Sequence, residues 1–315
     1  MKVVITGGCG FIGTNLMQYL EKTEPDTEIV LLDIVTPSVP MGQNTRYIYG
    51  DIRNLKCLLD VFEGCDEVYN LAGILGTSEL IPLSSLACDV NILGANNVLD
   101  AARICGVSRV YNVAKPHFDG YDENAYTLTK HGGELLGQMY QRQYGMEVAT
   151  VRWLNAVGPH QHLYPVRKFL PMMVLLALYG YPLEVYGDGS QTIDPIDTED
   201  LSRFTVHACR NLGKSRDVVD LGSGRAISCK DTAEMILEVM GDMGLALAPE
   251  VTIKHVPMRD GEKEGVNLVA DMSYWTSIGM QAEVPFKESI RKTVEYIVGL
   301  PDYHKKNAMK FYGVE

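Results

Sequence analysis

Tyr126 and Lys130 are the side chains of this sequence whose types and spacing best suit proton transfer. Residues four apart on a helix share one face, so the phenol and the ammonium would be neighbours. A phenol is a poor base at neutral pH, and a nearby cation lowers its pKa and makes it useful as a general base. The Tyr-x-x-x-Lys spacing alone is a weak signal, because both residues are common on exposed helix faces. How strongly this spacing indicates a catalytic pair depends on the elements that precede it in the chain.

A glycine-rich turn, GGCGFIG at 7–13, opens the chain and supplies that context. A β-branched run at 2–6 precedes it, and apolar residues at helical spacing follow at 11–20. Strand, glycine turn and helix together indicate a dinucleotide-binding fingerprint, in which the last glycine lets helix pack on strand. The helix N-terminus offers N–H groups and a positive dipole end to the phosphates. The residues expected to contact the cofactor here are Gly7, Gly10, Phe11, Ile12 and Gly13.

Asp33 predicts which dinucleotide is bound. It ends a second apolar strand run, Glu28 to Leu32, twenty residues after Gly13. An acid at this place accepts hydrogen bonds from the adenosine ribose and repels a 2′-phosphate. The sequence therefore predicts NAD rather than NADP.

Composition excludes several classes of protein. The 315 residues carry a net charge of −12, which argues against nucleic acid or an anionic membrane as a partner. The seven cysteines are scattered and form no Cys-x-x-Cys pair, which is typical of reduced thiols in a cytoplasmic protein and of neither a disulfide framework nor a metal site. No apolar run approaches the length of a membrane span, and the start on a strand leads us to expect no signal peptide.

Strands and helices alternate through the first half of the chain, which predicts an α/β fold with a doubly wound parallel sheet of the Rossmann type. From Gly158 the elements become shorter and Pro and Gly recur, which predicts a smaller, mixed α/β substrate lobe over the carboxyl edge of the sheet. We expect an NAD-binding domain at 1–157, to which part of 190–220 returns, and a substrate lobe at 158–315. The elements expected in the first domain after residue 33 are a strand at 46–49, a helix at 54–62, a strand at 67–70, a long amphipathic helix at 84–105, a strand at 109–113, a helix at 123–144 and a strand at 147–152.

The motifs and their order resemble the extended short-chain dehydrogenases/reductases of the NAD-dependent nucleotide-sugar epimerase/dehydratase type, over nearly the whole chain. The segments that carry the resemblance are TGGCGFIG, GDIRN, NLAG, DVNILGANNVLDAAR, YTLTK, VRWLNAVGPHQ, PLEVYGDGSQTIDPIDTEDLSR, LGSGRAIS and the Arg-x-Gly-Glu at 259–262. In that family the tyrosine takes a proton from a sugar hydroxyl, and the lysine holds it ionised and binds the nicotinamide ribose.

The resemblance also implies roles for other residues of this sequence. It places Asp51 and Ile52 against the adenine, and Asn91 as a prop of the active site. It implies a substrate-positioning role for Asn155 and diphosphate contacts for Arg225 and Arg259. The further residues expected to line the cofactor are Leu71, Ala72, Gly73, Asn91 and Val113.

Two departures from the family pattern change these expectations. The family usually has Ser or Thr just after the fifth strand, whereas this chain reads Val113-Ala114-Lys115-Pro116. The loop from there to Tyr126 is about half the usual length. Our hypothesis is that Lys115 lines the sugar pocket, either as a donor to the reacting oxygen or paired with a carboxylate of a uronic acid sugar. The alternative is that Thr77 or Thr127 donates the hydroxyl.

The second departure is Ile193, which stands where the family has a diphosphate-binding arginine before Asp194. Arg259, with Arg225 or Arg167, is then expected to hold the diphosphate.

The reaction implied is transient oxidation of a nucleotide-bound sugar at C4 by a retained NAD. A UDP-sugar 4-epimerase is favoured, because Pro116-His117 stands where the family's 4,6-dehydratases carry Asp-Glu. An NDP-sugar dehydratase and a UDP-glucuronate decarboxylase stay open, as does a catalytically silent NAD-binding scaffold protein. In the family the counterparts of 84–105 and 123–144 pair into a four-helix bundle, so we expect a homodimer.

Overall fold

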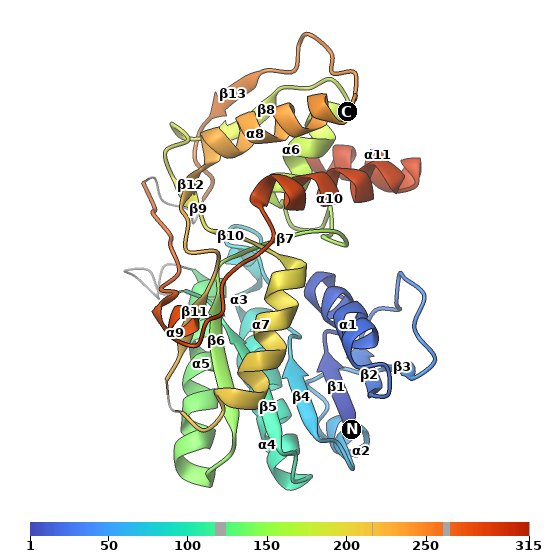
Figure 1. Cartoon of the computed structure of the whole chain (residues 1–315), viewed down its shortest axis with the longest axis vertical. Coiled ribbons are helices and arrows are strands. Elements are labelled where there is room, and N and C mark those ends of the chain that lie inside the picture. Colours follow the sequence, from blue (N-terminus) through green and yellow to red (C-terminus); the bar gives the residue numbers. More distant parts are fainter. Residues whose placement is uncertain (117–123, 216, 261–264, 315) are drawn as a thin grey trace. The chain divides into compact units, whose positions relative to one another are not determined.

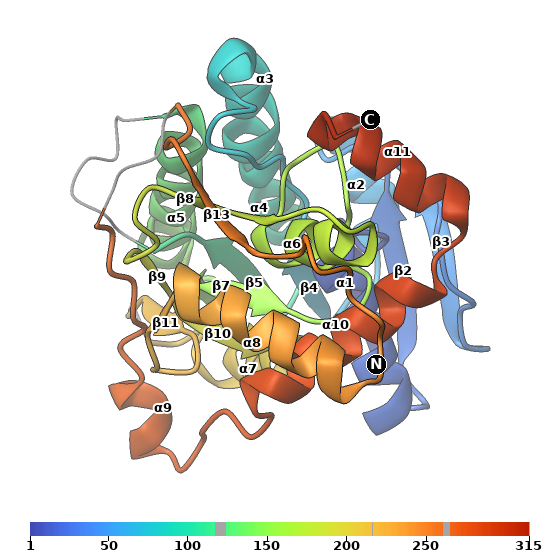
Figure 2. The same ribbon diagram turned by 90° about the horizontal axis from the view of Figure 1, so that it is seen from above.

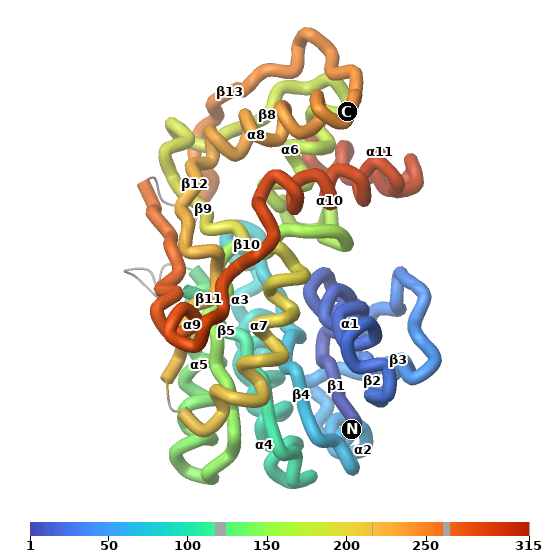
Figure 3. The backbone as a smooth tube through the Cα atoms, in the orientation of Figure 1, coloured from blue at the N-terminus to red at the C-terminus, as the bar shows by residue number. Residues whose placement is uncertain are grey.

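The computed structural model of the chain describes residues 1–116, 124–215, 217–260 and 265–314. Three residues singled out above, His117, Glu123 and Glu262, lie outside these ranges. The described chain forms two compact units, drawn in Figures 1 and 3: unit 1 is Met1–Trp153 with Leu201–Leu221, and unit 2 is Leu154–Asp200 with Gly222–Glu315.

Unit 1 is built on a seven-stranded sheet in the order β11-β6-β5-β4-β1-β2-β3, with every neighbouring pair parallel. The predicted doubly wound parallel sheet is therefore confirmed. The carboxyl ends of parallel strands meet at one edge, where ligands of such folds bind. The strands are β1 Lys2–Thr6, β2 Glu28–Asp33, β3 Thr45–Tyr49, β4 Glu67–Asn70, β5 Arg109–Ala114, β6 Val148–Trp153 and β11 Val219–Leu221.

Helices cover both faces of this sheet, as the two ribbon views show (Figures 1 and 2). On one face α2, α4 and α5 share a core with alternate strand residues such as Val4, Val68 and Val110. On the other face the strand tyrosine Tyr111 meets Thr205 of α7. The alternation arises because successive strand side chains point to opposite faces. The helices are α1 Phe11–Thr23, α2 Leu55–Phe62, α4 Ala95–Ile104, α5 Ala125–Tyr144 and α7 Thr198–Asn211.

The helix predicted at 84–105 is interrupted, which corrects the expectation of one regular amphipathic helix. A 3-10 turn at Ile81–Leu83 leads into α3, Ser84–Cys88, and a π-helical segment, η2 Asp89–Gly94, comes before α4 begins. Such π segments inside α-helices often occur at functional sites, and this one contains Asn91.

The boundary between the units falls at Trp153 and Leu154, four residues before the expected end at 157. Directly after it, β7 Asn155–Val157 pairs in parallel with β10 Pro195–Asp197 in a small sheet of unit 2. The chain returns to unit 1 at Leu201, within α7, and stays until β11 pairs with β6 at the sheet edge. The returning segment is thus 201–221, which falls within the expected range of 190–220 except for its last residue.

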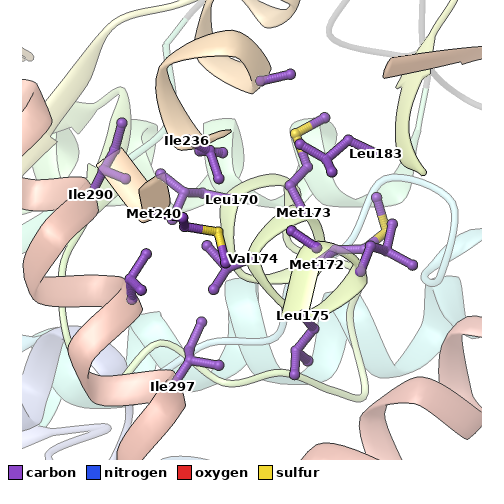
Figure 4. Packing of buried hydrophobic residues seen from close by; sticks show 14 of the residues in the cluster. Leu170, Met172, Met173, Val174, Leu175, Leu183, Ile236, Met240, Ile290 and Ile297 are labelled. Carbon is purple, nitrogen blue, oxygen red and sulfur yellow. The ribbon is translucent and has the colours of Figure 1, made fainter. Parts of the chain in front are cut away.

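Unit 2 is organised around α6, Phe169–Leu178, which is apolar on every side and almost wholly buried (Figure 4). A helix of that kind forms the middle of a core. Helices α8 Cys229–Asp242, α10 Phe286–Gly299 and α11 Asp302–Tyr312 contribute to the same cluster; α11 was not predicted. The remaining elements are α9 Ser273–Ser277 and the strands β8 Leu183–Tyr186, β9 Thr192–Ile193, β12 Ile227–Ser228 and β13 Ile253–Val256.

In the part of the chain that the structure describes, no helix combines the length and the apolar character needed to cross a bilayer.

Candidate active site

Helix α5 carries Tyr126 and Lys130, and its start is fixed by a side-chain cap. The side chain of Asn124 accepts a hydrogen bond from the Thr127 N–H at 2.9 Å, which satisfies one of the free amides of the first turn. Further along, the buried carboxylate of Glu134 accepts two hydrogen bonds from Arg152 of β6 at 2.7 and 2.8 Å. These contacts fix where the helix lies along the sheet.

A row of buried polar residues crosses four strands at one register and meets α5. Thr6 is opposite Asn70, Asn70 opposite Asn112, and Asn112 opposite Thr150. Thr6 Oγ1 donates to Asn70 Oδ1 at 3.0 Å, and Asn70 Nδ2 donates to Asn112 Oδ1 at 3.2 Å. Asn112 Nδ2 then donates to the carbonyl of Gly133 in α5 at 3.0 Å. The row therefore ties the helix to the strands one turn past Lys130.

Glycines let α5 lie this close to the row. A Cβ at Gly137 would stand 2.7 Å from Thr150 Oγ1 and 2.9 Å from Asn112 Nδ2. Real Cβ atoms do not approach so closely, so a larger residue at 137 would push the helix off the sheet. Since Tyr126 and Lys130 are on the same rigid helix, their positions depend on this contact.

Asn91 joins α5 to the loop after β4. Its Oδ1 accepts from the Ile74 N–H at 2.9 Å, and its Nδ2 donates to the Ile74 carbonyl at 2.9 Å and to Thr129 Oγ1 at 3.0 Å. Thr129 Oγ1 in turn donates to the Ala125 carbonyl at 2.7 Å. Both amide protons of Asn91 are used in this clamp, so the side chain positions the site and has no donor left for a cofactor.

Lys130 reaches back to the same loop. Its Nζ is 3.9 Å from the point where a Cβ on Gly73 would lie, and Asn91 Oδ1 is 3.0 Å from that point. Gly73 is exposed and comes directly after Leu71 and Ala72. The structure thus brings the ammonium of Lys130 to the segment at 71–73 that was expected to line the cofactor.

Burial shifts the pKa of both members of this pair. Desolvation raises the pKa of Tyr126 to about 12 and lowers the pKa of Lys130 to about 8. A low-polarity environment disfavours the charged form of each group, so both shifts have the same origin. The shift of the Tyr126 pKa is caused by burial, and the lowering of the phenol's pKa by Lys130 stays a prediction.

The glycine turn has the shape of a phosphate cradle. Gly7 has a positive φ of 68°, and a Cβ there would lie 2.8 Å from the backbone of Ala72. A Cβ on Gly13 would lie 2.4 Å from the Gly7 carbonyl, so helix and turn are in direct contact. Helix α1 begins after Gly10 with no side-chain cap and no acid in its first turn. The amides of Phe11, Ile12 and Gly13 are therefore open to an anion, as a dinucleotide pyrophosphate requires.

Asp33 lies against this turn at the end of β2. Its Oδ2 accepts from the Cys9 N–H at 3.0 Å and its Oδ1 from the Val35 N–H at 3.2 Å. Burial and the Asp33 charge together raise the pKa of the Cys9 thiol to about 12, so that thiol stays protonated. The carboxylate is held beside the turn, which suits the ribose of NAD, and the residues present fit this cofactor.

Three other residues expected at the cofactor, Asp51, Ile52 and Val113, make contacts within the protein. Asp51 binds the Arg53 guanidinium at 2.5–3.0 Å, and these hydrogen bonds hold the pKa of its carboxyl below the usual range. Ile52 is buried against Gly94 of the π segment, and its carbonyl accepts from Asn97 at 3.2 Å. Val113 is buried within β5. The contact of Asp51 and Ile52 with adenine, and that of Val113 with the cofactor, stay predictions.

Lys115 stands beside Tyr126. It comes directly after Ala114, the last residue of β5, and its Nζ lies over the Tyr126 ring, 5.8 Å from the ring centre. Of the two threonines weighed for the missing hydroxyl, Thr127 is 4% exposed and Thr77 is partly buried in the turn at 77–80. The structure thus brings the ammonium of Lys115 to the Tyr126 ring.

In unit 2 two of the expected substrate residues, Asn155 and Arg225, contact Asp194, a buried carboxylate whose role was not predicted from the sequence. Its buried carboxylate accepts from the N–H groups of Ser223, Gly224 and Ala270 at 2.7, 3.0 and 2.8 Å. The Asp194 N–H donates to Asn155 Oδ1 at 3.1 Å. The Arg225 N–H also points to this carboxylate at 3.4 Å, while the Arg225 side chain is exposed.

Arg259 and Arg167 meet on one aromatic residue, Tyr186 of β8. The Arg259 guanidinium lies 5.5 Å from the Tyr186 ring centre, and Arg167 Nη1 donates to the Tyr186 hydroxyl at 3.5 Å. Arg167 also donates to the Tyr312 carbonyl at 3.0 Å. The structure therefore gathers Arg167 with Arg259 and does not show Arg225 with them.

Most of the functional residues that were not predicted are polar residues within apolar segments of the sequence. Asn70 and Asn112 are amides inside apolar strands, and buried polar groups are found where they are hydrogen-bonded. Asp194 lies between Ile193 and Pro195 in a similarly apolar segment. Thr129 gave no such signal, because a threonine three residues after a tyrosine on a helix is unremarkable until its partner Asn91 is known.

Comparison with known proteins agrees with this geometry. The model of the family described as "NAD dependent epimerase/dehydratase family" matches residues 3–222. The low-salt glycan biosynthesis protein Agl12 of Haloferax volcanii is 28% identical over 95% of this chain and 99% of its own length. The dTDP-glucose 4,6-dehydratase of Streptomyces niveus is 26% identical over 94% of this chain and 92% of its own.

The fold of the chain also matches that of a solved structure. The epimerase Mth375 of Methanothermobacter thermautotrophicus superposes with a TM-score of 0.86 at 25% identity, over 97% of this chain and 94% of that one. The protein is an enzyme that uses NAD, and it belongs to the NAD-dependent epimerase/dehydratase family.

Proposed function

We propose that this enzyme is a nucleotide-sugar epimerase that acts by transient oxidation at the sugar C4, with a UDP-sugar as its substrate. The observation that carries the proposal is the arrangement of Tyr126 and Lys130 on α5, with Lys130 Nζ at Gly73 and the helix clamped by Asn91. This arrangement supplies one proton acceptor beside the segment expected to line the cofactor, and a C4 hydroxyl needs one acceptor.

When bound, NAD supplies the hydride acceptor for the oxidation and the hydride donor for the re-reduction. Tyr126 Oη takes the proton from the sugar hydroxyl and returns it to the same oxygen later. Because burial raises the pKa of Tyr126, its ionised form needs positive charge close by, and Lys130 is the cation on its own helix face. Lys130 also has hydrogen-bond donors for the hydroxyls of the cofactor ribose.

Epimerisation is favoured over elimination because of the residues that come directly after β5. A dehydratase must remove a proton next to the new keto group and protonate a leaving hydroxyl, which calls for further acid and base groups. Lys115-Pro116 supplies no carboxylate there. A 4,6-dehydratase is the second candidate, since the Streptomyces niveus relative carries that name.

We assign the diphosphate of the substrate to Arg259 and Arg167. Their shared contact with Tyr186 holds two guanidinium groups near each other, and paired guanidinium groups suit diphosphate oxygens. Asn155 is assigned to the sugar, because its Oδ1 is held by the Asp194 amide while its amide protons can donate.

We further propose a homodimer built on α3, η2 and α5. Their exposed leucines repeat at seven-residue spacing, with Leu86 and Leu93 on the first stretch and Leu128 and Leu135 on α5. All four are 37–50% exposed, and such paired apolar stripes are typical of helix–helix interfaces.

The experiment that tests the activity is a panel of UDP- and dTDP-sugars, read by mass and chromatography, with Tyr126→Phe as the matched control. An isomer of unchanged mass, formed by the native enzyme and lowered at least about a hundredfold in Tyr126→Phe, is expected because a general base is lost. Loss of water from the product would reassign the enzyme as a dehydratase. Equal turnover in Tyr126→Phe would refute the role of the phenol.

A further inference from the structure

Lys115 occupies a position beside the candidate base that the proposed chemistry does not yet use. Its Nζ lies 5.8 Å from the centre of the Tyr126 ring, and its backbone continues directly from β5. The carboxyl end of β5 is flanked by that of β4, where the loop at 71–73 begins. The ammonium is therefore at the edge of the sheet at which the reacting sugar would be bound.

The reaction needs a second hydrogen-bond donor at this place. When the hydroxyl carbon is oxidised, its oxygen becomes a carbonyl, and negative charge develops on that oxygen as the carbonyl is reduced again. The phenol can give only one hydrogen bond to the oxygen. No hydroxyl is present at 113–116, and Thr127, the nearest along α5, is 4% exposed.

We propose that Lys115 is a catalytic residue, whose ammonium donates the second hydrogen bond to the reacting sugar oxygen in place of a hydroxyl side chain. This inference rests on the proposed function and names a group that function lacks. An oxygen bonded to the phenol lies about 2.7 Å from Tyr126 Oη, within range of the flexible four-carbon stem of Lys115. Hydrogen bonds from a charged donor are also roughly twice as strong as neutral ones.

Lys115 keeps its proton throughout the reaction. In the first half the C–H and O–H bonds of the alcohol break, the hydride goes to oxidised NAD, and the proton goes to the Tyr126 phenolate. In the second half the hydride adds to the other face of the carbonyl carbon, and Tyr126 gives the proton back. The sugar loses and regains two electrons, so the ammonium has only to stabilise charge on the oxygen.

The decisive test compares four replacements of Lys115 on the sugar that the native enzyme turns over in the panel. Lys115→Ala and Lys115→Met remove the donor and are expected to lower kcat about a hundredfold with a smaller change in KM. Lys115→Ser restores a neutral donor and is expected to recover at least about tenfold of that loss. Lys56→Ala, an exposed lysine of α2, is the matched control and should match the native enzyme.

The outcomes separate this proposal from its competitors. If the substrate carries a carboxylate, and Lys115→Arg, the fourth replacement, keeps activity while Lys115→Ser does not, the ammonium pairs with that carboxylate, and the donor role is overturned. On a sugar without a carboxylate the same result supports a charged donor. Native turnover in Lys115→Ala, with a large loss in Tyr126→Phe, would refute the role of Lys115 and leave the proposed function standing. Equal turnover in Tyr126→Phe would instead remove the proposed function itself.

Discussion

Replacing Asn91 by alanine is expected to uncouple the loop after β4 from α5 and to loosen the whole site. The change removes hydrogen bonds of 2.9 Å to the Ile74 carbonyl, 2.9 Å from the Ile74 amide and 3.0 Å to Thr129 Oγ1. Each is worth about 0.5–1.5 kcal/mol net, and water can replace some of them because Ile74 is only partly buried. We therefore expect a loss of about 2–3 kcal/mol in the free energy of unfolding of unit 1.

The two tryptophans allow this loss to be measured for unit 1 alone. Trp153 ends β6 in unit 1, and Trp275 is buried in unit 2. In a Trp275→Phe background, the fluorescence of Trp153 during urea unfolding reports on unit 1. Asn96→Ala is the matched control, because it removes one hydrogen bond, from Tyr140, in the same helical stretch.

The coupling itself can be isolated with a double-mutant cycle. Thr129→Val keeps the side-chain shape and removes the hydroxyl that Asn91 contacts, so the two losses should not add, with an interaction energy of about 0.5–1.5 kcal/mol. We also expect turnover to fall about tenfold or more in Asn91→Ala, because small misplacements of catalytic groups are costly. A loss of stability below about 0.5 kcal/mol, additive with that of Thr129→Val, would show that the clamp has no energetic role.

Three further outcomes are expected. Asp33→Asn keeps one hydrogen-bond acceptor for the Cys9 amide but removes the negative charge. The ratio of the NADP and NAD dissociation constants, measured by titration, should therefore fall by about 5- to 150-fold, which corresponds to about 1–3 kcal/mol of repulsion. An unchanged ratio would show that other residues determine the selectivity. The pKa of Lys130 is about 8 in the folded protein, below its value of about 10.5 in the unfolded chain. Below pH 8 the folded state therefore carries a buried charge. The free energy of unfolding should rise as the pH increases from about 8 to 10.5, because the folded state loses this charge first. That rise should be absent in cofactor-free Lys130→Met, measured as the difference in urea midpoints between the two proteins; parallel curves would contradict the assigned burial. Replacing both Leu93 and Leu128 by Glu places four negative charges in the proposed dimer interface, two from each subunit. Sedimentation at micromolar concentration should then show a monomer for the variant and a dimer for the native chain. A monomeric native chain would rule the interface out.

The sequence by itself determined the features that depend on local conformation. The parallel sheet results from alternating strands and helices, and the structure confirms it. The turn at 7–13 results from glycine spacing, because only glycine accepts the positive φ of Gly7 and the close approach at Gly13. The shared helix face of Tyr126 and Lys130 results from the helical repeat alone.

Only the tertiary structure decided how these parts are held together and what charge they carry. Thr6, Asn70, Asn112 and Thr150 form one row because strand register aligns residues that are up to 144 positions apart in sequence, and no local pattern encodes register. The same holds for the clamp formed by Asn91. The pKa values of Tyr126 and Lys130 depend on how much water the surrounding elements exclude, which is a property of packing. The place of Lys115 beside the phenol is likewise a result of where β5 ends relative to α5, because the segment between them has no periodicity from which its path could be predicted.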